Sequence, residues 1–100
     1  MNFYSIIIQQ LGGQGRLKAM IGASAYVYDE QGQSLRFQFK GCKSANICKI
    51  TLLPSDTYQL ELFKFSPKKL DCTPTFSREM VYCDQLRTVF ENATGLYLSL

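Results

Sequence analysis

Four of the eleven cationic residues fall in one stretch near the middle of the chain. Arg36, Lys40, Lys43 and Lys49 follow one another with no acidic residue among them. Arg36, Gln38 and Lys40 alternate with apolar residues, so they would share one face of a β-strand. Proteins that bind single-stranded nucleic acid place such cations beside aromatic rings on which bases stack, and Tyr26 or Tyr28 would supply a ring. We therefore predict a nucleic-acid or partner contact surface made of Arg36, Gln38, Lys40, Lys43 and Lys49.

The alternative interpretation of these residues is an ordinary solvated face. Charged side chains on the wet side of a sheet aid solubility without binding anything. The formal net charge of +3 is too small to indicate a nucleic-acid partner by itself. Both interpretations stay open on the sequence alone.

The residue types needed for covalent catalysis are poorly represented. The chain has no histidine to activate a serine or cysteine nucleophile. Its eight acidic residues fall in predicted turns or on polar faces, whereas a catalytic carboxylate with a tuned pKa usually lies in apolar surroundings. We predict that the protein is not an enzyme and uses no cofactor.

Four cysteines are present, and their spacing argues against a metal site. Cys42, Cys48, Cys72 and Cys83 include no Cys-x-x-Cys pair. Zinc sites use close pairs of Cys and His ligands, so we predict no bound metal. Buried free thiols that behave as small hydrophobic groups are the better interpretation.

A glycine corner at Gly12, Gly13 and Gly15 marks the sharpest break in the chain. Gly12-Gly13-Gln14 matches the tripeptide of peptide release factors, which three residues in a Gly-rich corner can do by chance. The string also fits the Gly-x-x-Gly loop of KH domains, but that loop lies between two helices, and here we expect a helix followed by a strand. The corner is therefore predicted to be structural.

Length and composition indicate one domain over residues 1–100. An apolar fraction of 46% can form a single core. No stretch approaches the roughly 20 apolar residues that span a bilayer, and the N-terminus lacks the pattern of a signal peptide. We therefore expect a cytoplasmic protein with no membrane partner. Nothing in the sequence indicates an oligomeric state.

The elements that would position these residues are read from hydrophobic periodicity. A first helix is predicted over Asn2–Leu11, capped by Asn2 and ended by Gly12 or Gly13 in the left-handed region. Alternation then predicts strands, and Phe63 and Phe65 indicate a bulge or an exposed aromatic edge. The predicted strands are Arg16–Tyr28, Ser34–Lys40, Cys48–Leu52 and a run from Tyr58.

A connection is predicted over Ser66–Pro74, followed by a C-terminal helix. Ser77 is the predicted N-cap of this helix, and Thr94-Gly95 ends it. Short connections favour an antiparallel meander. The predicted fold is α+β: an N-terminal helix, a four-stranded antiparallel sheet and a C-terminal helix packed on one face of the sheet. That helix is expected to cover Leu35, Phe37 and Phe39.

Several strings resemble a family of small uncharacterised proteins encoded by phages, prophages and plasmids. They are Gln10-Leu11-Gly12-Gly13, Gly15-Arg16-Leu17-Lys18-Ala19-Met20-Ile21-Gly22-Ala23, Lys49-Ile50-Thr51-Leu52, Asp56-Thr57-Tyr58, Val81-Tyr82, Asp84-Gln85-Leu86, Phe90 and Thr94-Gly95-Leu96. Departures from the family pattern include Gln14 and Cys83. The stretch from Phe65 to Thr75 is also longer and richer in proline, so a partner surface there would differ.

The resemblance implies a mobile-element origin in a bacterial host and no enzymatic activity, and it supplies no functional residues. It suggests a non-catalytic accessory protein that binds a host or element-encoded macromolecule, with anti-CRISPR-like inhibition as one form, by association only. The alternative is a weak single-stranded DNA or RNA binding module that uses the basic sheet face.

Overall fold

The computed structural model describes residues 3–29, 31–42, 44–55, 57–66, 68, 71–82 and 84–96. These residues form, in order, α1 (Phe3–Gln10), α2 (Gln14–Ile21), β1 (Ser24–Asp29), β2 (Ser34–Gln38), β3 (Ile47–Leu52), β4 (Tyr58–Ser66), β5 (Asp71–Val81) and α3 (Leu86–Thr94). The predicted α+β class is confirmed, with five strands instead of four. No helix in the described ranges is long and apolar enough to cross a membrane.

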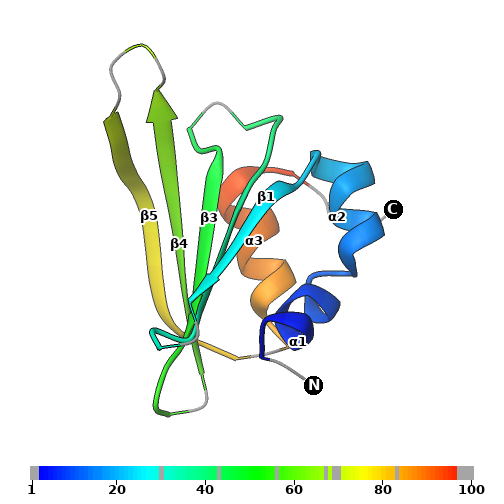
Figure 1. The fold of residues 1–100 in the computed structure, drawn as a ribbon, viewed down its shortest axis with the longest axis vertical. Coiled ribbons are helices and arrows are strands. Elements are labelled where there is room, and N and C mark those ends of the chain that lie inside the picture. The colour runs from blue at the N-terminus through cyan, green and yellow to red at the C-terminus, as the bar shows by residue number, and fades with distance from the viewer. Residues whose placement is uncertain are drawn as a thin grey trace.

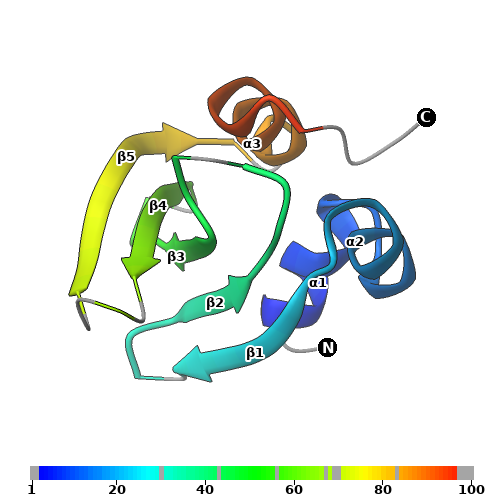
Figure 2. The same ribbon diagram turned by 90° about the horizontal axis from the view of Figure 1, so that it is seen from above.

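The strands form an antiparallel meander in the order β1-β2-β3-β4-β5. The helices α1, α2 and α3 of the described residues lie on the same side of this sheet (Figures 1 and 2). We call the side that faces the helices the inner face and the opposite side the outer face. Alternation along β2 sets the two faces, because Leu35 and Phe37 are buried whereas Arg36 and Gln38 are exposed.

The core lies between the inner face and the helices. Phe90 of α3 is fully buried, and its ring centroid lies 5.2 Å from that of Phe39 and 6.4 Å from that of Phe37. The predicted contact of the C-terminal helix with Phe37 and Phe39 is confirmed. Helices α1 and α2 also cover part of the inner face. The core residues of this N-terminal region include Ile7, Leu11, Leu17 and Ile21.

The predicted strand over Arg16–Tyr28 is wrong in its first half, which is helix α2. Leu17, Ala19 and Ile21 fit a period of two, but only Leu17 and Ile21 are buried and Ala19 is exposed. Leu17 and Ile21 are four residues apart and lie on one face of a helix. Gly22 then ends α2 in the left-handed region, at φ 64°, and β1 begins two residues later.

The predicted N-cap at Ser77 is also wrong, because Ser77 lies inside β5. The predicted connection over Ser66–Pro74 therefore contains the end of β4 and the start of β5. Pairing with the long strand β4 overrides the local capping signal. Pro74 is tolerated because β5 is an edge strand. The helix begins only at Leu86, although its predicted end at Thr94-Gly95 is confirmed, with Gly95 at φ 75°.

Strand β4 keeps its alternation through Phe63 and Phe65, and the predicted bulge lies in its partner β5. The register of β4 against β3 is regular, whereas the pairing of β4 with β5 shifts between Leu62 and Phe63. The irregularity therefore lies in β5. Phe63 and Phe65 continue the alternation of Glu61 and fall on the outer face of an interior strand.

Candidate binding groove on the outer face of the sheet

Register brings charged residues from successive strands into one row across the outer face. Arg36 of β2 pairs directly with Lys49 of β3, and Lys49 pairs on its other side with Glu61 of β4. Val27 of β1 lies opposite Arg36 at the other end of the row. Residues paired in this way have Cβ atoms about 4.5–5.5 Å apart. Two like charges are thus neighbours, with an apolar residue on one side and an acid on the other.

Three adjoining cavities make this surface a continuous groove. The largest, about 350 Å³, includes Val27, Arg36, Gln38, Ile47 and Phe65 in its lining. A cavity of about 200 Å³ shares Gln38, Ile47 and Phe65 with it, and another of about 200 Å³ shares Val27 and Arg36 and adds Lys49. We call the combined surface the outer-face groove, lined chiefly by Val27, Arg36, Gln38, Ile47, Lys49 and Phe65.

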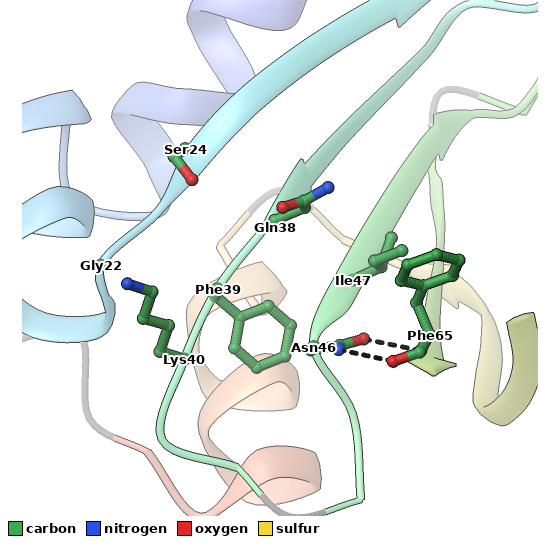
Figure 3. A pocket seen from close by; sticks show the side chains of 8 residues that line it. All are labelled: Gly22, Ser24, Gln38, Phe39, Lys40, Asn46, Ile47 and Phe65. Carbon is green, nitrogen blue, oxygen red and sulfur yellow. Dashed lines mark hydrogen bonds between the residues drawn. The ribbon is translucent and has the colours of Figure 1, made fainter. Parts of the chain in front are cut away.

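Asn46 fixes the aromatic end of the groove. Its Nδ2 donates to the carbonyl of Phe65 at 3.0 Å, and its Oδ1 accepts from the backbone N–H of Phe65 at 2.8 Å (Figure 3). The side chain thus imitates a backbone partner and extends the pairing of β3 with β4 by one step. Phe65 is consequently held beside Ile47, which is 9% exposed.

Lys40 reaches the groove from the segment that follows β2. Its backbone N–H donates to the carbonyl of Ile21 at 2.8 Å, which ties this segment to the end of α2. Its aliphatic stem lies over Gly22, where an added Cβ would be 3.5 Å from Lys40 Cδ. An added Cβ at that distance would make an ordinary contact with the lysine stem (Figure 3), so it is the left-handed turn that requires glycine at this position.

Two acidic residues lie beside the cations of the groove. Asp29 lines the cavity that contains Arg36 and Lys49, and its Oδ1 accepts from the backbone N–H of Gln31 at 3.1 Å. Glu61 is the paired neighbour of Lys49. The stretch that lacks acids in the sequence is therefore flanked by acids in space, and the surface carries charges of both signs.

Four of the five predicted contact residues meet on the outer face. Arg36, Gln38, Lys40 and Lys49 all line the groove, whereas Lys43 lies outside the described residues. Tyr26 is not on this surface, because its ring packs against Phe37 with centroids 5.7 Å apart. Tyr28 pairs with Leu35, an inner-face residue.

Phe65 is a partly exposed ring of the groove, and sequence reasoning did not assign it there. Phe37 and Phe39 also line these cavities but are buried. Val27, Ile47 and Asn46 were also missed as groove residues. The break in parity at Phe63 and Phe65 was a usable signal for the aromatic part. No local pattern identified Asn46, because its role is a contact with a residue 19 positions away.

The glycine corner is confirmed as a backbone feature but joins different elements from those predicted. Gly12 and Gly13 have φ values of 118° and 96°, and they lie between α1 and α2. A KH-type Gly-x-x-Gly loop was considered unsuitable because a strand was expected to follow the corner. That expectation is wrong, since the corner joins two helices. Arg16 and Lys18 are exposed on the helix that follows the loop.

The described cysteines have three different environments. Cys48 is fully buried, and burial raises the pKa of its thiol, whereas Cys72 is exposed, contrary to expectation. Partial burial raises the pKa of Cys42, but hydrogen bonds with Ser44 and Ala45 and the charge of Lys64 outweigh it, so the net effect is a lowered pKa. Cys83 lies outside the described residues.

The groove offers recognition chemistry: apolar surface, an amide and charges of both signs. In the described part of the chain, no group of three His, Cys, Asp or Glu residues is placed to hold a metal ion. No family model matches the sequence, and neither the curated proteins nor the solved structures contain a match.

Proposed function

We propose that this protein is a non-catalytic accessory protein, of the kind encoded by phages and plasmids, and that it binds a host or element-encoded protein. The outer-face groove is the proposed contact surface. One observation carries the proposal: apolar side chains adjoin charges of both signs on the sheet face that the described helices leave uncovered (Figure 1).

This composition suits a protein partner better than a polyanion. Protein interfaces combine an apolar centre with a polar rim, and complementary charges set the orientation of the partner. Val27, Ile47 and Phe65 supply the centre, and Arg36 and Lys49 lie beside them. A strand of nucleic acid would also meet the nearby carboxylates of Asp29 and Glu61.

The resemblance to small proteins of mobile elements supports the choice of partner. Such elements carry many small proteins that inhibit or adapt host machinery, and inhibition of a defence complex in the manner of anti-CRISPR proteins is one form of the proposed activity. This support is by association, because a fold does not define a function.

Affinity capture from a bacterial host lysate tests the proposal. The immobilised protein is exposed to nuclease-treated lysate, and the retained proteins are quantified by mass spectrometry. We expect a stoichiometric protein that is retained by the parent and lost by the Arg36→Glu, Lys49→Glu double variant. The Lys18→Glu, Arg87→Glu double variant changes the net charge equally at exposed helical positions and should retain it. Equal capture by both double variants, or no stoichiometric protein, would contradict the proposal.

A second candidate function is weak binding of single-stranded DNA or RNA on the basic sheet face. Phe65 favours it, because an aromatic ring on the outer face beside Gln38 and Lys40 is suited to base stacking. Affinity for a labelled oligonucleotide should then fall steeply with salt, and it should weaken in the Lys40→Ala, Lys49→Ala variant. A Gly15→Asp variant locates the site, because a loss of affinity on this change would place the nucleic acid at the glycine corner instead.

A further inference from the structure

Arg36 directly opposes Lys49 across two strands, and the acids Asp29 and Glu61 lie beside this pair of like charges. Directly opposed like charges on one sheet face destabilise the pairing of two strands. A carboxylate placed over both side chains would accept charge-assisted hydrogen bonds from each and remove the repulsion. The cavity of about 200 Å³ lined by both residues gives space for such a group.

The adjoining cavity has a different character. Its volume is about 350 Å³, and its lining includes Ala25, Val27, Ile47, Phe65 and Cys72. A large aliphatic or aromatic side chain would bury apolar surface here. Arg36 lines both cavities, so an apolar side chain and a carboxylate would be bound next to one another.

The spacing of the two cavities follows the strands. Arg36 lies beside Lys49 in the charged row, and Gln38, two residues further along β2, lies opposite Ile47. Two residues of a strand span about 6.6–6.8 Å, which is also the separation of side chains i and i+2 in an extended peptide. Gln38 offers an amide donor and acceptor for the backbone of that peptide.

We propose that the outer-face groove binds an extended segment of a partner protein that carries Asp or Glu two positions from a large apolar residue. The carboxylate lies over Arg36 and Lys49, and the apolar side chain enters the cavity between Val27, Ile47 and Phe65. This inference rests on the proposed protein-binding function and specifies the chemistry of the partner. Asp29 lines the same cavity and Glu61 is paired with Lys49, and both acids disfavour a segment with several successive acids.

Selection from a library of random displayed peptides tests the inference. The full chain is the bait, and selected sequences are resynthesised for fluorescence anisotropy. We expect enrichment of peptides with an acid two positions from Leu, Ile, Phe or Met. The Arg36→Glu, Lys49→Glu variant should bind them about tenfold more weakly or worse, as expected when charge complementarity is reversed. The Lys18→Glu, Arg87→Glu variant is the matched control and should bind like the parent.

A charge-swapped peptide keeps the test independent of misfolding. If the acid of a selected peptide is replaced by Lys, binding to the parent should be lost and binding to the Arg36→Glu, Lys49→Glu variant should be regained. The absence of a common acidic position, or equal binding by parent and reversed variant, would overturn the inference. So would displacement of the peptide by a single-stranded oligonucleotide that binds more tightly, since the occupant would then be a nucleic acid. Lysate capture that depends on the groove while peptide selection fails would refute this inference alone.

Discussion

Replacement of Phe90 by Ala tests the core that supports the outer face. Phe90 is fully buried in α3, and its ring meets those of Phe37 and Phe39 on the inner face. A buried Phe→Ala change costs about 3–5 kcal/mol, which combines lost transfer energy with the cavity left behind. Each aromatic pair contributes about 0.5–1.5 kcal/mol within that total, and two pairs are lost here. We expect a loss in the upper half of the range.

This loss is large relative to the stability of the whole domain. Domains of this kind are commonly stable by about 5–15 kcal/mol, so the Phe90→Ala variant should be marginal. Arg87→Ala is the matched control, because Arg87 is exposed on the same helix, and it should change the free energy of unfolding by less than about 0.5 kcal/mol.

Urea unfolding followed by circular dichroism measures both variants. The slope of the free energy with urea should match that of the parent, which would show that the extent of unfolding has not changed. A loss below about 1 kcal/mol, well under the expected range, would refute the reasoning. In that case α3 would be peripheral, and the core would depend on Ile7, Leu11 and Leu17 of the N-terminal helices.

The remaining predictions concern three local features. Burial raises the pKa of Tyr26, and its buried hydroxyl has no hydrogen-bond partner among the described residues. Tyr26→Phe should therefore raise the free energy of unfolding by about 1 kcal/mol. A lower free energy of unfolding in urea would show instead that the hydroxyl is hydrogen-bonded. Gly13→Ala should lower the free energy of unfolding by about 1–2 kcal/mol because the φ of Gly13 is 96°. Gly15→Ala, in open space within α2, should raise it by up to about 1 kcal/mol. Equal shifts of the melting temperature in the two variants would rule out a strained corner. Because alkylation requires the thiolate, Cys42, with its lowered pKa, should react with iodoacetamide at a lower pH than an ordinary cysteine, and its rate should rise with pH. Buried Cys48 should react only on unfolding, and peptide mass spectrometry distinguishes the two sites.

Elements with a single consistent period were predictable from the sequence. Alternation in β2 correctly placed Leu35 and Phe37 opposite Arg36 and Gln38. In the C-terminal helix, spacing predicted a stripe of Tyr82, Leu86, Val89, Phe90 and Ala93. The last four lie in α3 and are buried or partly buried, whereas Tyr82 precedes the helix and is exposed. These segments form where they do because local periodicity and tertiary burial agree.

Segments with two compatible periods were not predictable. Leu17 and Ile21 fit a helix as well as a strand. The two structures differ in the burial of Ala19, which is exposed in the helix that forms. Ser77 has the local chemistry of a helix cap, but it pairs with Glu61 in the sheet. Tertiary pairing decides such cases, and it is not encoded in a short window of sequence.

The candidate site was predictable only in its sequence-local part. Arg36, Gln38 and Lys40 share a strand and its extension, so their common face follows from alternation. The positions of Glu61 and Phe65 beside them depend on the register of β3 with β4. That register changed the interpretation, because it placed an acid on a face predicted to be basic and put the ring of Phe65 there in place of Tyr26 or Tyr28.

The order of elements along the chain has a consequence for folding during synthesis. Every strand pairs with its immediate predecessor, so the hairpins form from local contacts as the chain emerges, and loop closure slows them little. Helix α3 follows all five strands. Until α3 has been synthesised, the apolar inner face of the sheet is therefore covered only by α1 and α2. Packing of α3 completes the core. Before that step, the exposed apolar surface makes the nascent chain most accessible to chaperones, proteases and self-association.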